Sequence, residues 1–210
     1  FVGSRGLGDV YKRQIENWPD FLDVMVSSIS DNGGRSCVNA SAVIVPKYAH
    51  EISEALGRRL GPVMPLPADD PNAILSGFAN PKMGHWIDST LETDLLEKGA
   101  VDATKPFRKG SRLVEAQGGT YLRPTIVHCD SMNHILANRE FLCPYASVVE
   151  VPQAEMLSSI GPTLVVTAIT KNEAFKKQLL GASNIERLNI GPISTMKISW
   201  DQPHEGNMFE

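Results

Sequence analysis

The sequence predicts a layered α/β/α domain whose main sheet is largely parallel. The first observation is a series of short apolar runs rich in branched residues, a pattern typical of buried strands. These runs cover residues 121–128, 146–151, 163–170 and 187–190. The second observation is a helical pattern over residues 173–180, between the last two runs. Strands that alternate with helices favour parallel pairing, with the helices packed on the sheet.

The first half of the chain begins with a helix, a turn and a strand. Apolar residues recur there at the spacing of an amphipathic helix: Trp18, Phe21, Leu22, Met25, Val26 and Ile29. Gly33 and Gly34 end this helix, where a left-handed backbone is wanted. Residues 42–46 then predict a short buried strand closed by proline. The turn therefore places one cysteine, Cys37, between the predicted helix and the predicted strand.

Two more helices are predicted before the strand-rich part. Residues 48–60 carry an apolar stripe, and Gly61-Pro62 ends it. Prolines at 62, 65, 67 and 71 predict a stiff connection within the domain. Residues 85–98 predict the second helix, with Gly99 at its end and four apolar side chains buried: Trp86, Ile87, Leu91 and Leu95. We interpret His85 as a surface or capping residue.

Composition is that of an ordinary globular domain. The chain has 210 residues, 42% of them hydrophobic and 21% charged, with a net charge of -4. This length suffices for one domain with a sizeable core. The charge favours neither nucleic acid nor an anionic membrane as a partner, and no apolar run is long enough to span a bilayer. The three cysteines, 37, 129 and 143, show no zinc-site spacing and fit a reducing compartment, so we expect a cytoplasmic protein without a metal site.

The local pattern leaves two roles open for Cys37. A cysteine is often a small packed residue with no chemical function. A thiol held between a helix and a strand is also well positioned for nucleophilic attack. We favour the catalytic thiol because of the resemblance described next.

Four stretches resemble motifs of the aldehyde dehydrogenase superfamily, in the family's order. Residues 33–41, Gly-Gly-Arg-Ser-Cys-Val-Asn-Ala-Ser, are similar to its active-cysteine motif, Gly-Gln-x-Cys followed by small residues. Residues 121–127, 138–144 and 187–192 are each similar to a later motif. The resemblance covers roughly residues 15–207. It implies the family's catalytic domain, incomplete over residues 15–210, without the nucleotide-binding domain.

The resemblance also implies site residues and a cofactor. It makes Cys37 the nucleophile and Glu140 a ligand of the nicotinamide-side ribose of NAD or NADP. Leu142 stands where the family's aromatic lies along the nicotinamide, and Cys143 stands where glycine is usual. Without the resemblance, a solvated loop carboxylate is an equally good interpretation of Glu140. For Cys143, a packed loop residue is a better interpretation than an auxiliary thiol. His204 is more often a surface residue than a base.

The implied reaction is NAD(P)-dependent oxidation of an aldehyde to a carboxylic acid through a cysteine thioester. The family's asparagine oxyanion donor and its general-base glutamate are not found in the chain, so we expect the chain alone to be inactive. The whole protein is expected to form homo-oligomers.

Three alternatives stay open. A member of the same superfamily could pass the thioester to coenzyme A, or reduce an acyl donor. A hydrolase could pair Cys37 with His128, His134 or His204. A superfamily member could keep the fold without catalysis, which the unusual Leu142 and Cys143 favour.

The first fourteen residues are interpreted as a non-native leader. Residues 9–14, Asp-Val-Tyr-Lys-Arg-Gln, can be translated back into the end of a common sequencing-library adapter. On this hypothesis the authentic protein begins near Ile15, and residues 1–14 are left out of the predicted fold. A polar N-terminal tail is the alternative.

Overall fold

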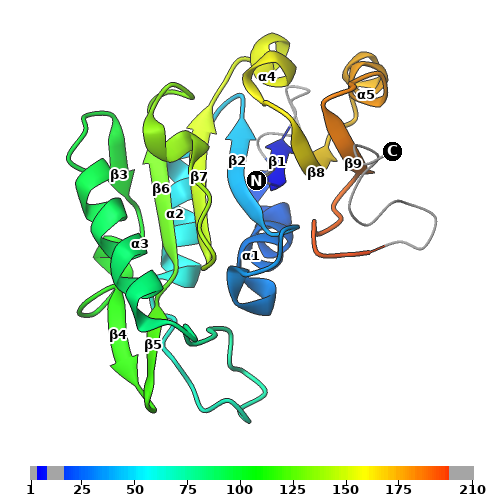
Figure 1. The fold of residues 1–210 in the computed structure, drawn as a ribbon. Helices are drawn as coiled ribbons and strands as arrows, with labels where there is room; N and C mark the ends of the chain where they lie inside the picture. The colour runs from blue at the N-terminus through cyan, green and yellow to red at the C-terminus, as the bar shows by residue number, and fades with distance from the viewer. Residues whose placement is uncertain (1–3, 9–16, 199–210) are drawn as a thin grey trace.

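The structure is a computed structural model, and it describes residues 4–8 and 17–198. Its main sheet has seven strands in the order β3-β6-β7-β2-β1-β8-β9 (Figure 1). These strands are β1 Ser4–Gly8, β2 Ala40–Val45, β3 Ala100–Asp102, β6 Thr125–Cys129, β7 Tyr145–Glu150, β8 Thr163–Ile169 and β9 Ile185–Ile190. All neighbours pair in parallel except β3, which is antiparallel to β6. The predicted α/β class with a largely parallel sheet is confirmed.

Five α-helices accompany the sheet in the described part of the chain. They are α1 Leu22–Ser30, α2 Ala49–Leu60, α3 Pro81–Asp94, α4 Gln153–Ser159 and α5 Glu173–Leu180. Short 3-10 turns η1 Trp18–Phe21, η2 Asp31–Gly34, η3 Lys105–Phe107 and η4 Ile135–Asn138 lie between them, and β4 Leu113–Ala116 with β5 Gly119–Leu122 forms a separate hairpin. None of the helices described is long and apolar enough to cross a membrane.

Two apolar clusters cover opposite faces of the sheet and make the domain layered. One contains Ile29 of α1, Ile52 of α2 and Val43 of β2. The other contains Ile87 of α3 and Ile44 of β2. This second cluster also takes in Met156 of α4 and both Phe175 and Leu179 of α5. Because neighbouring residues of a strand point to opposite faces, β2 contributes to both clusters and is buried on both sides. In Figure 1, α3 lies in front of the strands and α2 behind them.

The helix predicted over residues 85–98 begins earlier, at Pro81, and ends at Asp94. The Asn80 side chain accepts a hydrogen bond from the Lys82 N–H, and proline is well suited to the first helical position, so this pair sets the start. Ile87 and Leu91 are buried as predicted, but Trp86 is 56% exposed. The prediction of a buried Trp86 is therefore wrong, because this side chain lies beside the apolar stripe rather than on it.

The strand predicted over residues 121–128 is broken into β5 and β6 at Arg123-Pro124. Proline has no N–H to donate to a sheet. Arg123 is 2% exposed, and its guanidinium donates to the carbonyls of Gly61, Val63 and Lys109. The break therefore ties the α2 exit and the loop after η3 to the hairpin, which no pattern of apolar residues could indicate.

Several elements were not predicted. They are the strands β1, β3 and β4 and the helix α4. The backbone of residues 4–8 pairs with β2 and β8, within the segment that the sequence analysis left out of the fold. The adapter origin of residues 1–14 stays a prediction. His204 lies outside the described residues.

Candidate active site

The Cys37 loop lies at the amino end of β2, between the end of α1 and the first residue of that strand. Gly33 and Gly34 have φ of +69° and +65°, so the left-handed turn predicted from sequence is confirmed. A Cβ on Gly34 would lie 2.4 Å from the Pro144 nitrogen and 2.5 Å from the Cys143 carbonyl carbon. Only glycine allows the two backbones to approach this closely.

Asn39 fastens the Cys37 loop to α1. Its amide nitrogen donates to the carbonyls of Ser28 and Asp31, both at 3.0 Å. Its amide oxygen accepts from the Ser36 N–H at 2.8 Å, while its own N–H donates to the Ser36 carbonyl. Carbonyls at a helix end have no partner within the helix. Asn39 satisfies two of them and thereby fixes the backbone on both sides of Cys37.

A second anchor comes from Arg35, on the other side of the loop. Its guanidinium donates to the Ser76 carbonyl at 2.8 Å and stacks over the Phe78 ring at 4.3 Å. A cation over an aromatic face is attracted by the ring's negative π surface. This contact holds the proline-rich connection beside the Cys37 loop.

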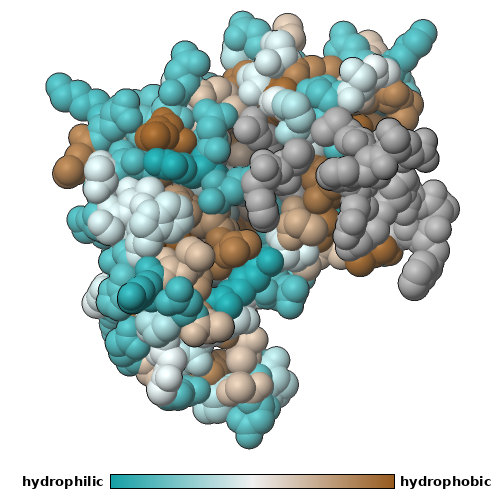
Figure 2. Space-filling model, in the orientation of Figure 1, coloured by the Kyte–Doolittle hydropathy of each residue, from teal (hydrophilic) through white to brown (hydrophobic). Residues whose placement is uncertain are grey.

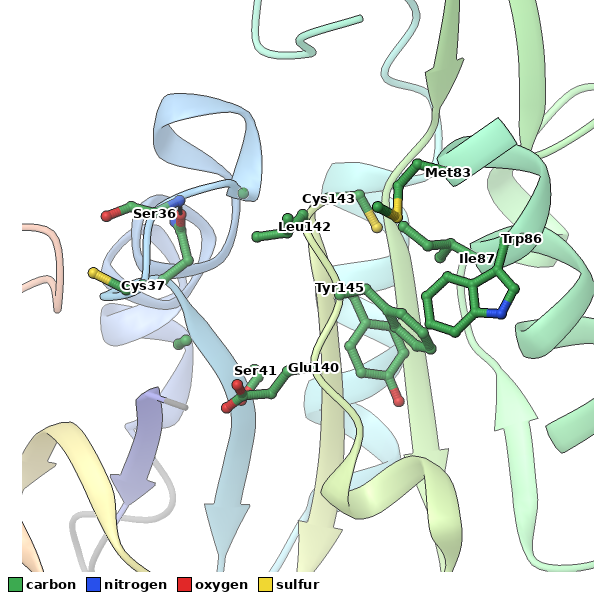
Figure 3. Close-up of a pocket in the computed structure, with 14 residues that line it drawn as sticks. Ser36, Cys37, Ser41, Met83, Trp86, Ile87, Glu140, Leu142, Cys143 and Tyr145 are labelled. Atoms are coloured by element: carbon green, nitrogen blue, oxygen red, sulfur yellow. Dashed lines mark hydrogen bonds between the residues drawn. The ribbon is translucent and has the colours of Figure 1, made fainter. Parts of the chain in front are cut away.

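A pocket of about 220 Å³ lies between the Cys37 loop, α3 and the loop before β7 (Figure 3). Its lining includes all three of the site residues predicted from sequence, Cys37, Glu140 and Leu142. The other lining residues are Gly34, Ser36, Asn39, Ala40, Ser41, Met83, Trp86, Ile87, Phe141, Cys143 and Tyr145. Residues that lie about a hundred positions apart are thus brought to one place, at the amino ends of β2 and β7. Their chemical roles stay predictions.

Glu140 is partly buried and points toward β2 in Figure 3. Its Oε1 accepts a hydrogen bond from the Ser41 hydroxyl at 3.3 Å. This contact orients one carboxylate oxygen. A carboxylate oriented in this way can accept further hydrogen bonds from hydroxyl groups of a ligand.

The mouth of the pocket is apolar and aromatic. Leu142 is 43% exposed, and Figure 2 shows apolar side chains near the middle of the face on which α3 lies. Trp86 packs edge-on against Phe141, which packs edge-on against Tyr145, with ring centroids 6.4 Å and 5.0 Å apart. Edge-to-face contacts of this kind fix ring orientation. The mouth therefore offers flat apolar surface to a ligand.

The environments of the three cysteines differ sharply. Cys37 is exposed, whereas Cys129 and Cys143 are buried. Burial raises the pKa of Cys129 to about 12, and the charge of Asp130 acts in the same direction. Burial also raises the pKa of Cys143 to about 12, although Arg112 and Arg35 oppose it. Since a thiolate is the reactive form, Cys37 is the cysteine of this pocket that can act as a nucleophile. The interpretation of Cys143 as a packed residue agrees with its burial.

Some polar residues around Cys37 carry roles that sequence reasoning missed. Asn39 was predicted only as part of the cysteine motif, and Arg187 only as part of a strand and of the motif-like stretch 187–192. The Ser41 partner of Glu140 was not predicted either. Among the described residues, no group of three or more His, Cys, Asp or Glu side chains could hold a metal ion. His85 lies in α3, on the surface, with Nε2 3.7 Å from Glu115 Oε1.

Comparisons with solved structures find the same fold in aldehyde dehydrogenases. The lactaldehyde dehydrogenase of Escherichia coli superposes with a TM-score of 0.76 at 18% identity, over 98% of this chain and 42% of that chain. A mutant 1-pyrroline-5-carboxylate dehydrogenase of Thermus thermophilus gives 0.74 at 17% identity, over 98% and 38%. A mutant aldehyde dehydrogenase of Bacillus cereus gives 0.74 at 16%, over 93% and 38%.

Comparisons at the level of sequence add nothing to this. No protein-family model matches the chain, and no curated protein matches it either. The likeness therefore concerns the fold, at identities of 15–18%. The chain spans about two fifths of the length of the structures it matches, and over that length it has the fold of the aldehyde dehydrogenases.

Proposed function

We propose that the chain is part of an NAD(P)-dependent aldehyde dehydrogenase that oxidises an aldehyde to a carboxylic acid through a thioester on Cys37. The observation that carries this proposal is the shared pocket of Cys37, Glu140 and Leu142. All three residues stand in stretches that resemble motifs of the family. Their convergence on one pocket, in a fold found in aldehyde dehydrogenases, is what a working site requires.

Cys37 carries the covalent chemistry in this proposal. Its thiolate attacks the aldehyde carbon, so a sulfur–carbon bond forms and the carbonyl π electrons move to oxygen. The carbonyl re-forms as hydride leaves the carbon, which leaves a thioester on Cys37. Water then attacks the thioester, the carbon–sulfur bond breaks, and the acid and the thiolate are released. The exposed position of Cys37 leaves room for a carbonyl group to approach.

The chemistry of the pocket residues suits a nicotinamide cofactor. When bound, the oxidised cofactor supplies the acceptor for the hydride. Glu140 has a carboxylate held at one oxygen by Ser41, and it would accept hydrogen bonds from ribose hydroxyls. Leu142 presents apolar surface that would pack along a planar ring. A 1-pyrroline-5-carboxylate dehydrogenase from Thermus, with the same fold and 17% identity, contains bound NAD.

The reaction is assigned to the whole protein. The chain spans 38–42% of the enzymes it superposes on, so we propose that the 210 residues alone do not turn over aldehyde. We also propose a cytoplasmic homo-oligomer that takes a small aldehyde and binds neither nucleic acid nor membrane.

The test is aldehyde oxidation by the full-length protein from the intact gene, followed through NADH or NADPH formation over a panel of aldehydes. Cys37→Ser should abolish turnover, because a serine hydroxyl is a far weaker nucleophile at neutral pH. Cys129→Ala is the matched control, since this cysteine lies in β6 outside the pocket. It should keep turnover once its fold is verified by circular dichroism.

The outcomes separate the proposal from its alternatives. Turnover that persists in Cys37→Ser would contradict the thioester mechanism. Product formation only in the presence of coenzyme A would favour the acylating members of the superfamily. A folded full-length protein without cofactor binding would favour a non-catalytic role.

A further inference from the structure

Arg187 of β9 is a buried cation without a carboxylate partner in the described part of the chain. Its residue exposure is 2%, and no ion pair within 4.0 Å involves it there. One of its amino groups, Nη2, donates to the Thr195 carbonyl, while Nε and Nη1 are buried and have no hydrogen-bond partner among the described residues. The buried Arg112, by contrast, bonds three carboxylates, those of Asp88, Glu92 and Asp102. A buried guanidinium without an anion is costly, so the environment of Arg187 needs a negative charge.

The fold brings Arg187 to the Cys37 loop. In the sheet, Arg187 pairs with Val165 of β8, so their side chains share a face. Val38, which follows Cys37 directly, belongs to one apolar cluster with Leu164 and Val165, against which Met196 packs. The loop carrying the thiol is therefore followed by a residue that clusters with the stretch of β8 paired with Arg187.

The segment after β9 links Arg187 to α1, the helix that precedes the Cys37 loop. The Thr195 N–H donates to the Ser28 hydroxyl of α1, and the Thr195 carbonyl accepts from Arg187. In Figure 3 the Cys37 thiol points away from Leu142, toward the side on which the red-orange segment after β9 is drawn. Burial lowers the pKa of the Arg187 guanidinium from its ordinary value, and the opposing influence is the thiolate charge of Cys37.

The other charged groups around the loop have partners elsewhere or lie on other faces. Asp31 accepts from the Ser27 hydroxyl, Glu140 is bonded by Ser41, and Arg35 is bonded to the Ser76 carbonyl. Glu186 neighbours Arg187 along β9 and therefore points to the opposite face of the strand. Lys197 is exposed at the end of the described segment. Cys143, on the far side of Leu142, stays a neutral thiol at physiological pH because burial raises its pKa to about 12.

We propose that Arg187 is the counter-ion of the Cys37 thiolate, a positioning residue that keeps this cysteine in its nucleophilic form. The proposal concerns the charge on sulfur and rests on the proposed function only in taking Cys37 as a nucleophile. The ion pair would also give the buried guanidinium its missing anion. Arg187 acts through Cys37 and need not touch the substrate.

The test measures alkylation of Cys37 by iodoacetamide in the 210-residue chain, followed by mass spectrometry of the Cys37 peptide from pH 5 to pH 10. Arg187→Met removes the charge and keeps an apolar stem. We expect its alkylation rate at pH 7 to fall roughly tenfold. An opposite charge nearby generally shifts the pKa of an acidic group down by about one unit or more, and its removal reverses that shift. Arg187→Lys keeps a positive charge and should lose less than Arg187→Met. Arg58→Met, at an exposed arginine of α2, is the control for charge removal elsewhere.

The shape of the pH profile distinguishes charge from packing. If Arg187 stabilises the thiolate, the rising part of the Arg187→Met profile moves to higher pH, and its rate at pH 10 equals or exceeds that of the unchanged chain. Superimposable profiles, or a rate lowered equally at every pH, would overturn the proposal. Arg187→Gln provides a second neutral variant should Arg187→Met not fold. Alkylation requires neither aldehyde nor cofactor, so a failed oxidation assay would leave this result intact, and the reverse holds as well.

Discussion

Gly34 and Pro144 are in backbone contact, and this contact joins the loop of Cys37 to the loop of Glu140. A Cβ on Gly34 would lie 2.4 Å from the Pro144 nitrogen, a distance that no side chain tolerates. The two halves of the candidate site come from strands that are neighbours in the sheet, β2 and β7. The two loops are therefore positioned by direct contact between their backbones. Such a contact leaves less freedom of movement than one made through flexible side chains.

Gly34→Ala should destabilise the domain and displace the Cys37 loop. The methyl group meets the Pro144 backbone, and the φ of +65° is unfavourable for alanine. Overpacking and left-handed strain together predict a loss of about 2–4 kcal/mol in the free energy of unfolding. Urea denaturation of the 210-residue chain measures this loss.

Gly110→Ala is the matched control for backbone strain alone. Gly110 has a φ of +80°, and a Cβ there would meet nothing within 4 Å. Its loss should be about 1–2 kcal/mol, the cost of left-handed backbone without a clash. Equal losses in the two variants would show that the contact with Pro144 does not constrain the loop.

Asn39→Ala should loosen the Cys37 loop without disturbing the sheet. It leaves the carbonyls of Ser28 and Asp31 without their donor and the Ser36 N–H without its acceptor. Hydrogen bonds lost at partly buried groups predict about 1–3 kcal/mol of destabilisation. Faster amide hydrogen exchange should appear at Ser36.

The control for Asn39 is Asn133→Ala, at an exposed position before η4. Its free energy of unfolding should change by no more than about 0.5 kcal/mol. An Asn39→Ala chain with unchanged exchange around Cys37 would contradict the role given to this side chain.

Much of the fold could be predicted because its signals are local. The stripes that bury Ile52 and Leu56 of α2, and the branched residues of β7 and β8, report directly on burial. The missed elements lack such signals. Strand β3 has three residues with Val101 64% exposed, and α4 has seven residues with Met156 as its one buried side chain. The break at Arg123 depends on carbonyls as distant in sequence as that of Gly61.

The candidate site also combines residues with a local sequence signal and contacts without one. Cys37 and Glu140 stand in motifs that can be found by inspection of the sequence. The contacts that orient them are long-range: Ser41 meets Glu140 across 99 positions, and Ser28 meets Thr195 across 167. Arg187 has no local signal at all, since a charged residue in a strand usually indicates an exposed face. Only the fold reveals that it is buried.

The three cysteines should react in a fixed order. At pH 8, Cys37 should be alkylated first, and Cys129 and Cys143 should react only on unfolding, because burial raises their pKa to about 12 and leaves almost no thiolate. Peptide mapping after brief treatment with iodoacetamide measures this order. Rapid labelling of Cys143 in the folded chain would show that the pocket opens further than the structure indicates.

The same two thiols predict a loss of stability in alkali. A raised pKa means that each stays protonated in the folded chain at pH values where the unfolded chain has already released its proton. The free energy of unfolding should therefore fall as the pH rises from the ordinary thiol value, about 9, to about 12, by roughly 1.4 kcal/mol per pH unit for each group. Urea denaturation of the double variant Cys129→Ala and Cys143→Ala should show a shallower slope than the unchanged chain. Parallel slopes would mean that other groups, such as Tyr145, govern the alkaline transition.

Asp102 should be the main acid-sensitive carboxylate of the domain. It is 7% exposed, and its Oδ2 lies 2.6 Å from Arg108 and 3.4 Å from Arg112. Burial alone would raise the pKa of Asp102, but Arg108, Thr104 and Arg112 outweigh it and hold that pKa below the ordinary 3.8. Because the folded chain holds the carboxylate ionised, this contribution to stability is present above pH 4 and is lost as the pH falls through the lowered pKa.

Asp102→Asn keeps the shape of the side chain and removes its charge. Arg108 thereby loses the carboxylate it pairs with, and Arg112 loses one of its three. The free energy of unfolding at pH 7 should fall by about 3–5 kcal/mol, the usual cost of breaking a buried pair from one side. The variant should also lose less stability than the unchanged chain between pH 4 and pH 2, since it has no carboxylate to protonate there. Glu54→Gln, which breaks an exposed pair with Arg58, should change stability by less than about 1 kcal/mol. Denaturation curves at pH 7, 4 and 2 measure both effects, and equal acid sensitivity in Asp102→Asn and the unchanged chain would place the acid-labile group elsewhere.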